Sequence, residues 1–328
     1  MIKNKVAILG AGMAGLYAAR LLHAAGIGFV VIEARERLGG RILTVDDRGQ
    51  PSEDGFDLGP SWFWPSMQPA IGALVEELGL PGFAQNSDGD VIFERTSGEI
   101  PQHYRGMAQD QQSMRLVGGT AALVRALAQG LPAEQIRLGA RVTALALAGD
   151  GVELTITIAD GGAEKLAARQ VIAALPPRLL EATVAFTPGQ EAATARRWRD
   201  TPTWMAPHAK FFALYDRPFW REAGMSGTMQ SMVGPMVEMH DATTASGAAG
   251  LFGFVGVSAE QRAAIGETAL TRACLDQLAR LLGTEARTPR ATLLKDWATD
   301  PLTATPADRA PGGHPAPDDG LWVTGPWR

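Results

Sequence analysis

The sequence of 328 residues predicts an α/β fold in two domains, on three observations. The chain is about twice as long as an average domain. It begins with an apolar run over 6–9, a glycine-rich turn, a helical pattern over 14–25 and a second apolar run over 29–33. Apolar strands without polar alternation are typical of a parallel sheet that is covered on both faces. After residue 180 the chain changes character, and strand-like runs surround one long amphipathic helix.

The remaining elements follow from the same periodicities. In the first part of the chain we expect helices over 69–78 and 120–131, a hairpin of strands 142–147 and 152–158 joined at Gly149-Asp150-Gly151, and a strand over 171–175. In the later part we expect strands over 209–215, 251–257 and 292–297 and a helix over 267–282. Residues 301–319 are rich in proline and glycine and are expected to be loop.

The composition is that of an ordinary globular protein, and it excludes several classes of function. The net charge is −5, and no basic stripe offers a surface for nucleic acid. Cys274 is the only cysteine, which excludes an intramolecular disulfide and a cysteine metal cluster, and we expect no metal. The sequence has no signal-peptide pattern and no run of about 18 apolar residues, so we expect a cytoplasmic protein without a membrane segment.

The turn before the first helix carries the dinucleotide-binding pattern G-x-G-x-x-G over 10–15. In this pattern Gly10 makes the tight turn, Gly12 lets the backbone approach a pyrophosphate, and Gly15 lets the helix pack closely on the strand. The phosphates then lie at the helix N-terminus, where free N–H groups favour negative charge. The sequence therefore predicts a dinucleotide site at this turn.

Residues 33–41 (E-A-R-E-R-L-G-G-R) favour FAD over NAD as the dinucleotide. Glu33 ends the second strand about 20 residues after the turn, where an acid accepts hydrogen bonds from ribose hydroxyls. Arg35 and Arg41, with the glycine pair before Arg41, put cations and bare backbone on the pyrophosphate side. The alternative for each arginine is a solvated surface cation.

These residues closely resemble the flavin amine oxidase family, in which E-A-R-x-R-x-G-G-R follows the dinucleotide fold and wraps the FAD. Five later segments are similar to family motifs in the same order: Asp57–Trp62 (D-L-G-P-S-W), Val117–Leu123 (V-G-G-T-A-A-L), Val171–Pro177 (V-I-A-A-L-P-P), Lys210–Trp220 (K-F-F-A-L-Y-D-R-P-F-W) and Lys295–Trp297 (K-D-W). The ordered set is far more specific than any one of these motifs, and it covers nearly the whole chain.

The resemblance implies a Rossmann-like FAD-binding domain interleaved with a mixed-sheet α+β substrate domain. We assign 1–81, 116–180 and 308–328 to the FAD-binding domain, and 82–115 and 181–307 to the substrate domain. Because the chain crosses between the domains repeatedly, we expect neither to fold well alone.

The resemblance also implies the residues of the cofactor site. Non-covalent FAD is expected to contact Gly10, Gly12, Met13, Ala14, Gly15, Glu33, Ala34, Arg35, Gly39, Gly40, Arg41, Gly59, Pro60, Ser61, Trp62, Val142 and Trp297. Lys210 is the expected catalytic residue, which in the family holds a water that bridges to flavin N5. By its own sequence context Lys210 begins an apolar strand, and the alternative is a lysine that snorkels to solvent. Asp57 is expected to be a cap rather than a catalytic acid.

The amine-binding site is expected to include Trp62, Trp204, His208 and Met232. His208 shares a face with Lys210 if the strand is regular, and a bland polar role is the alternative. Met232 belongs to a set of methionines spaced at helical intervals between 225 and 239, where glycine and proline forbid a continuous helix. These methionines form either core or an adaptable wall of a substrate cavity.

Two departures from the family affect the cofactor and the amine site. Residues 298–306 lack the cysteine to which monoamine oxidases attach FAD, and they lack the tyrosine of the aromatic cage. We therefore expect non-covalent FAD and an amine site built differently, with Trp62, Trp204 or Trp297. Residues 321–328 resemble the lead-in to the family's A-G-x-E-T motif, which does not follow here. Either a C-terminal segment is absent from this sequence or the protein is naturally truncated and binds FAD poorly.

The reaction that the resemblance implies is oxidation of the C–N bond of a small-molecule amine. Hydride passes to flavin N5, water hydrolyses the imine, and O2 reoxidises the flavin with release of hydrogen peroxide. The partners expected are therefore the amine and O2, with a homodimer as an open alternative. Two other functions stay open: a flavin desaturase or porphyrinogen-type oxidase acting on C–C bonds, and an inactive flavin-fold protein with a binding role.

Overall fold

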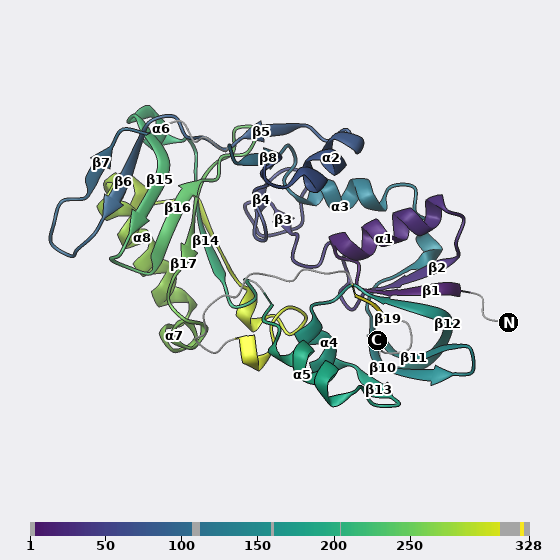
Figure 1. Cartoon of the computed structure of the whole chain (residues 1–328). Helices are drawn as coiled ribbons and strands as arrows, with labels where there is room; N and C mark the ends of the chain where they lie inside the picture. Colours follow the sequence, from purple (N-terminus) through teal and green to yellow (C-terminus); the bar gives the residue numbers. More distant parts are fainter. Residues whose placement is uncertain (1–3, 107–111, 159–160, 204, 309–321, 325–328) are drawn as a thin grey trace. The chain divides into compact units, whose positions relative to one another are not determined.

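The computed structural model describes residues 4–106, 112–158, 161–203, 205–308 and 322–324. The chain divides into two compact units, each built from separate stretches of sequence (Figure 1). The first unit consists of Met1–Ile42, Leu123–Ala206 and Asp300–Arg328, and the second of Leu43–Ala122 and Pro207–Thr299.

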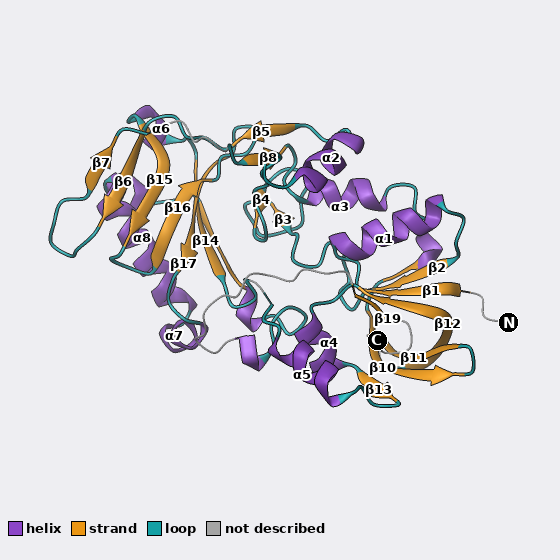
Figure 2. Ribbon diagram, in the orientation of Figure 1, coloured by secondary structure: helices purple, strands orange, loops and turns teal. Residues whose placement is uncertain are grey.

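An eight-stranded sheet forms the centre of the first unit (Figure 2). Its strands are β1 (Asn4–Leu9), β2 (Phe29–Ile32), β9 (Ile136–Arg137), β10 (Ala140–Ala148), β11 (Gly151–Ile158), β12 (Ala163–Ala173), β13 (Ala185–Thr187) and β19 (Trp322–Thr324). They lie in the order β13-β10-β11-β12-β1-β2-β9, with β19 paired to β12. β1 runs parallel to both of its neighbours, β2 and β12, which confirms the parallel pairing expected of these apolar strands.

Helices and the predicted hairpin complete the first unit. The helices are α1 (Met13–Ala24), α3 (Ala121–Ala128), α4 (Pro177–Thr183) and α5 (Ala192–Asp200), with short 3-10 turns η1 (Ala133–Gln135) and η4 (Pro306–Asp308). The first two residues of α3 belong to the second unit. α1 buries Leu16 and Ala19 completely, which are positions of its predicted apolar stripe. The hairpin of β10 and β11 forms where Gly149-Asp150-Gly151 predicted it, and its inward side chains make the core of the sheet.

The second unit is built on a seven-stranded sheet with the order β18-β14-β17-β16-β15-β6-β7 (Figure 2). These strands are β6 (Asp90–Glu94), β7 (Gln102–Tyr104), β14 (Ala209–Tyr215), β15 (Met225–Ser231), β16 (Met236–Asp241), β17 (Ala249–Val255) and β18 (Ala291–Asp296). Two small sheets pair β3 (Thr44–Val45) with β4 (Phe56–Asp57), and β5 (Gly82–Ala84) with β8 (Met114–Leu116). The helical elements are α2 (Pro69–Glu77), α6 (Phe219–Glu222), α7 (Ala259–Ile265), α8 (Glu267–Leu282), η2 (Thr284–Arg287) and η3 (Trp297–Thr299).

Every residue of β14 is buried, and its two faces meet different neighbours. Phe211 belongs to the core that contains Cys274 of α8. Phe212 belongs to a separate cluster with Phe56. Because side chains alternate along a strand, Lys210 shares the face of Phe212 and lies opposite α8. The alternation of this one strand therefore carries a lysine into the interior of the second unit.

The methionines from 225 to 239 lie in the antiparallel pair β15–β16 or, for Met232, in the connection between the two strands, and not in a helix. Met229, Met236 and Met239 are completely buried in the core against α8. Core packing, the first of the two predicted roles, is confirmed for these three. The spacing suggested helical periodicity only because two strands and their connection fall at similar intervals.

The borders of the compact units differ from the predicted domain borders. Residues 43–81 and 116–122 pack with the second unit, and 181–206 pack with the first, where Trp198 enters the core of the sheet. The compact units are defined by contacts between residues. The predicted domains were instead defined by whether a segment is expected to bind the cofactor or the substrate. The assignment of segments to cofactor and substrate stays a prediction.

Candidate active site

Two glycines of the predicted dinucleotide turn are required by the fold itself. Gly10 has φ +98°, and a Cβ there would lie 2.9 Å from Leu175 Cδ2 and 3.0 Å from the carbonyl oxygen of Ala174. A Cβ on Gly15 would lie 1.9 Å from the carbonyl oxygen of Gly10. The turn and the close packing of α1 on the sheet therefore depend on the absence of side chains at both positions.

Gly12 differs from these two because nothing in the fold occupies the space beside it. Its φ of −72° and ψ of 179° suit any residue, and a Cβ there would meet no described atom within 4 Å. α1 begins at the next residue, Met13, and has no side-chain cap. Open space before an uncapped helix N-terminus is where a phosphate binds well. The described residues of this turn thus fit the pyrophosphate of a dinucleotide.

Glu33 lies directly after β2 and is buried beside the turn. Its Oε2 accepts a hydrogen bond from Ala11 N at 2.7 Å, and its Oε1 accepts one from Arg35 N at 2.8 Å. Each carboxylate oxygen can accept a further bond, so the side chain is fixed in place and still able to receive ribose hydroxyls. This arrangement suits the predicted role of Glu33.

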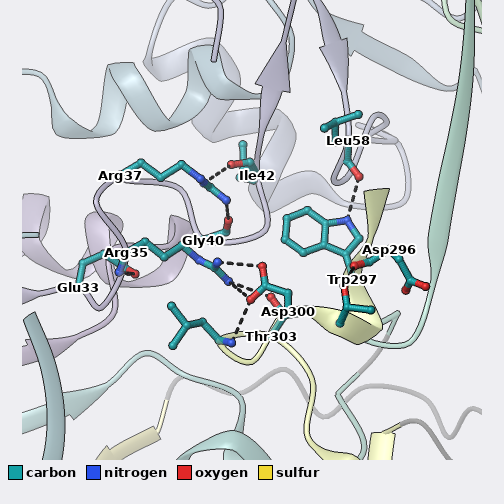
Figure 3. A network of polar contacts seen from close by, with 12 residues as sticks. Glu33, Arg35, Arg37, Gly40, Ile42, Leu58, Asp296, Trp297, Asp300 and Thr303 are labelled. Atoms are coloured by element: carbon teal, nitrogen blue, oxygen red, sulfur yellow. Dashed lines mark hydrogen bonds and ion pairs between the residues drawn. The ribbon is translucent and has the colours of Figure 1, made fainter. Parts of the chain in front are cut away.

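Arg37, which the sequence analysis did not identify, holds the glycine loop that follows. Its guanidinium donates to the carbonyl oxygens of Leu38, Gly40 and Ile42 at 3.0, 2.7 and 3.2 Å (Figure 3). Gly40 accepts this loop conformation at φ +57°, in the left-handed region that favours glycine. Arg37, the middle arginine of E-A-R-E-R-L-G-G-R, therefore shapes the backbone of the motif.

Arg35 is not the solvated surface cation that one sequence-based alternative proposed. Its guanidinium forms a two-pronged ion pair with Asp300 at 2.9 and 3.0 Å and donates to Thr303 Oγ1 at 3.0 Å (Figure 3). Its side chain holds the segment at Asp300–Thr303, and its predicted contact with a cofactor stays a prediction. The sequence separation of 265 positions explains why no local pattern predicted this pair.

The structure neither supports nor contradicts the predicted cofactor contacts of Arg41, Val142 and Ala34. Arg41 is half-buried and has polar contacts of its own. Val142 lies in β10 and packs in the core of the first unit, where its register partner is Ile156. Ala34 is half-buried in the loop after β2. Their contacts with a cofactor stay predictions.

Lys210 is the centre of the polar cluster in the second unit, and its side chain is only 5% exposed. Its Nζ donates to the carbonyl oxygen of Gly59 at 2.6 Å, to Ser61 Oγ at 2.8 Å and to the carbonyl oxygen of Asp57 at 3.2 Å. An ammonium has three donors, so this loop satisfies all of them. The snorkelling alternative is wrong, because the side chain points into the protein.

Burial lowers the pKa of Lys210 to about 7. Desolvation is the largest cause, the charge of Asp57 opposes it, and the charge of Arg115 adds to it. Aromatic rings also surround the ammonium, which lies 4.6 Å from the ring centre of Phe252 and 5.4 Å from that of Phe254. A lysine with this pKa exchanges its proton close to neutral pH.

Asp57 caps the start of α3, as its sequence context predicted. Its Oδ1 accepts from Thr120 N at 2.9 Å, Thr120 Oγ1 at 2.8 Å and Thr44 Oγ1 at 2.6 Å. Burial raises the pKa of the carboxyl, while the hydrogen bonds from Thr44 and Thr120 lower it. The same residue thus positions a helix through its side chain and Lys210 through its carbonyl group.

Trp62 covers the same face of the sheet. Its Nε1 donates to Gln85 Oε1 at 2.8 Å, and its ring lies 4.7 Å from that of His240 and 5.4 Å from that of Phe252. The sequence analysis missed Gln85, His240, Phe252 and Phe254. The alternation of Phe252 and Phe254 in a predicted strand was the signal that could have found two of them.

Trp297 is buried and tied to the loop that holds Lys210. Its Nε1 donates to the carbonyl oxygen of Leu58 at 2.9 Å (Figure 3). Lys295 Nζ lies 4.4 Å from the centre of its indole ring. The structure therefore brings the D-L-G-P-S-W and K-D-W motifs together, as the resemblance required.

The other predicted amine-binding residues, His208, Met232 and Trp204, differ in how far the structure describes and supports them. His208 directly precedes β14 and is half-buried, and its carbonyl oxygen accepts from Trp297 N at 3.0 Å. Met232 lies between β15 and β16 and is 75% exposed, which gives the predicted cavity wall no support at that position. Trp204 lies outside the described residues.

Two classes of feature are absent from the part of the chain that the structure describes. It contains no group of three or more His, Cys, Asp or Glu side chains that could hold a metal ion. In the same residues, no helix has the length and apolarity needed to cross a membrane.

Comparison with known proteins identifies the class. The model of the family described as flavin containing amine oxidoreductase matches residues 83–327, and that of an NAD(P)-binding Rossmann-like domain matches residues 8–78. Since the first match covers most of the sequence, the chain belongs to the flavin-containing amine oxidoreductase family. A flavin cofactor follows from that membership and agrees with the dinucleotide turn.

Individual relatives are similar over shorter stretches. The chain is 38% identical to a putrescine oxidase of Kocuria rosea over 99 residues, which are 30% of this chain and 19% of the relative. It is 43% identical to a putative flavin-containing monoamine oxidase, AofH, of Mycobacterium tuberculosis over 102 residues, which are 31% of this chain and 21% of the relative. The matched sequence thus spans about one fifth of each relative.

Solved structures share the fold over nearly the whole chain. A putrescine oxidase bound to putrescine gives a TM-score of 0.79 at 22% identity, covering 92% of this chain and 86% of that one. Cyclohexylamine oxidase from Brevibacterium oxydans gives 0.79 at 21% identity, covering 93% and 87%. At these identities the likeness establishes the Rossmann-like and mixed-sheet architecture, and nothing about substrate.

Proposed function

We propose that the chain oxidises the C–N bond of a small-molecule amine with non-covalently bound FAD. The observation that carries the proposal is the burial of Lys210 against the Asp57–Ser61 loop, with Ser61 149 residues away in the sequence. This contact brings the lysine together with the Asp57–Ser61 loop, which the family resemblance assigns to the flavin. Family membership and the dinucleotide turn support the same cofactor.

The chain's own residues would divide the work of binding and proton handling. The turn at Gly12 would receive the pyrophosphate, and Glu33 would receive the ribose hydroxyls. FAD, when bound, would accept hydride from the carbon beside the amine nitrogen and return the electrons to O2 as hydrogen peroxide. Lys210, with a pKa of about 7, can exchange a proton near neutral pH.

Non-covalent binding is supported by the position of the only cysteine. Cys274 is completely buried in α8, on the opposite face of β14 from Lys210. Burial also raises the pKa of its thiol to about 12, so the thiol is unreactive. Neither its position nor its chemistry suits a covalent tether to a flavin.

We propose an amine whose carbon skeleton packs on aromatic side chains. Trp62, Phe252 and Phe254 contact one another on the sheet face of Lys210, and His240 adjoins them. Relatives named putrescine, monoamine and cyclohexylamine oxidases indicate the range of amines to test. O2 as electron acceptor, a cytoplasmic location and a homodimer stay predictions.

The proposal is tested with the full chain, added FAD and a panel of primary and secondary amines, including diamines. We expect amine-dependent hydrogen peroxide, with one aldehyde formed for each peroxide. Gly12→Val is the matched control, because it keeps Lys210 and should lose the cofactor. Amine-independent peroxide, or loss of hydrogen across a C–C bond in place of aldehyde formation, would contradict amine oxidation.

A further inference from the structure

Asp57 is a buried carboxylate whose helix-capping role explains only one of its two oxygens. The residue is 2% exposed, and Oδ1 takes all three of its hydrogen bonds, from Thr44 and Thr120. Oδ2 is buried and has no hydrogen-bond partner among the described residues. Serine or asparagine caps a helix as well as aspartate does. Capping alone therefore gives no reason for a negative charge at this place.

Burial raises the pKa of Asp57, so its carboxylate stays ionised only if other groups compensate the charge, because removing an ion from water costs several kcal/mol. Two cations act on Asp57 within the second unit: Lys210, whose Nζ is hydrogen-bonded to the Asp57 carbonyl oxygen, and Arg115, which is 6% exposed. Arg115 already donates to the carbonyl oxygens of Thr243 and Ala242. Lys210 has only neutral oxygens as hydrogen-bond partners, so it depends more on the charge of Asp57.

We propose that Asp57 is a positioning residue whose negative charge keeps the proton on Lys210. The inference rests on the proposed function for its importance, since it assigns the group that sets the protonation state of the predicted catalytic lysine. It goes beyond that function because neither the family resemblance nor the capping role gives the carboxylate a part in the chemistry.

The other charged and titratable groups on the surrounding elements include Arg115, Arg221, Glu238, His240, Asp241, Lys295 and Asp296, the last of which is paired with Arg262. Arg221 is paired with Asp241, and His240 with Glu238. Lys295 is the register partner of Lys210 on β18, and as a like charge it disfavours a second ammonium. Arg115 thus opposes protonation of Lys210, and Asp57 is the carboxylate that favours it.

The protonation state of Lys210 at neutral pH therefore depends on the side chain of Asp57. The pKa of Lys210 is already lowered to about 7 by burial, so a small further change decides whether it is charged at neutral pH. The charge of Asp57 raises the pKa of Lys210, and loss of a nearby opposing charge typically moves a pKa by about one unit or more. Without the charge of Asp57, Lys210 should be mostly neutral at pH 7.

The experiment is an NMR titration of the full chain with lysine labelled with 13C at Cε. The sequence has few lysines to resolve, namely Lys3, Lys5, Lys165, Lys210 and Lys295. The signal that disappears in Lys210→Met assigns the residue. We expect Lys210 to titrate about one pH unit lower in Asp57→Asn than in the parent. Asparagine keeps the Oδ1 acceptor and places its amide where Oδ2 has no partner, so no described hydrogen bond is lost.

Asp54→Asn is the matched control, because it removes one charge from the exposed part of the same segment. We expect this control to leave the Lys210 titration in place. An unchanged or raised pKa in Asp57→Asn would overturn the proposal. Should Asp57→Asn fail to fold, Asp57→Ser keeps a capping oxygen and must give the same downward shift.

The titration is independent of turnover, so it separates this inference from the proposed function. If no amine is oxidised, the NMR shift still decides whether Asp57 holds the proton. If amines are oxidised, the limb of the pH profile of kcat/KM that reports Lys210 should move down by the same amount in Asp57→Asn. A profile that moves without the NMR shift would assign that limb to another group and contradict the role of Asp57.

Discussion

Lys210 owes its chemistry to the strand that carries it. β14 is buried on both faces, so the lysine cannot reach water, and the loop from Asp57 to Ser61 supplies its three hydrogen-bond acceptors. Two of these acceptors are carbonyl groups that can only accept, whereas the Ser61 hydroxyl can also donate to a neutral amine. The lysine can therefore lose its proton and still be hydrogen-bonded by Ser61.

The first prediction at the residue scale concerns turnover. Lys210→Met keeps an apolar stem and removes the ammonium, so amine oxidation or flavin reoxidation should slow by about 100-fold or more, within the range of acid–base contributions. FAD affinity should change by less than about tenfold, since the dinucleotide turn is untouched. Stopped-flow measurement of each half-reaction checks this, with Lys165→Met, an exposed lysine, as control. Equal rates in both half-reactions for mutant and parent would leave Lys210 a structural residue.

The second prediction follows from the lowered pKa of Lys210. The unfolded chain holds this proton up to its ordinary pKa of 10.5, whereas the folded chain releases it at about 7. Folding is therefore favoured as pH rises through this window, and the benefit is lost as pH falls through 7. Relative to Lys210→Met, the parent should gain about 1 kcal/mol per pH unit between pH 7.5 and 9.5. Denaturant unfolding at several pH values measures this, and a flat difference would mean that the folded lysine has an ordinary pKa.

At this scale the sequence predicted residues whose partners are local or belong to a motif. Glu33 was predicted from its spacing after the glycine turn and Lys210 from the family motif, and their contacts with FAD stay predictions. The partners of Arg35 and Trp62 were not found, because Asp300 lies 265 residues and Gln85 lies 23 residues away. Such pairs depend on how the chain folds back, which no periodicity encodes.

At the scale of elements, the turn over 10–15 and α1 contain glycines that the fold requires and one glycine that it does not require. Gly10 and Gly15 are needed for the turn and for helix packing, whereas Gly12 leaves room that no described atom fills. The sequence predicted these roles because the three positions follow one known geometry. It could not predict that β15 and β16 form where the methionines suggested helical spacing, because a short apolar run fits either period.

This distinction gives the third prediction, a pair of single substitutions. Gly12→Val should fold with a free energy of unfolding within about 1 kcal/mol of the parent, because its backbone conformation is ordinary. Its FAD affinity should fall at least about 100-fold, since the side chain fills the phosphate space. Gly15→Val should instead lose about 3 kcal/mol or more of stability, because its Cβ would lie 1.9 Å from a carbonyl oxygen.

Thermal unfolding of the FAD-free chains and FAD titration by flavin fluorescence measure the two effects separately. The control is the comparison between the two variants, which add the same side chain three residues apart. Unchanged FAD affinity in Gly12→Val would show that the glycine-rich turn over 10–15 serves only the fold and does not bind the cofactor.

At the scale of the whole molecule, the sequence predicted the fold class and the repeated crossing of the chain. Each unit is assembled from separate stretches, as expected, but the borders follow packing rather than ligand contacts. The segment 181–206 joins the first unit because Trp198 is buried in its core. A single tryptophan in an otherwise polar helix did not predict this packing. Motif order was informative here because each motif marks a contact between distant segments.

The fourth prediction concerns how the whole protein holds its cofactor. Acid precipitation of the flavin-loaded chain should release all the yellow colour into the supernatant, because Cys274, the only cysteine, is buried in α8. The absorbance spectra of supernatant and pellet decide the question, and mass spectrometry of the supernatant should identify FAD. Colour retained in the pellet would mean a covalent link through another residue.

The most direct test of amine oxidation is anaerobic mixing of the flavin-loaded full chain with each amine of the panel. We predict that at least one amine bleaches the visible flavin band with a rate that saturates with amine concentration. Admission of O2 should then restore the band and release one hydrogen peroxide per flavin. A flavin that stays oxidised with every amine, and is bleached by a compound that loses hydrogen from a C–C bond, would contradict the account.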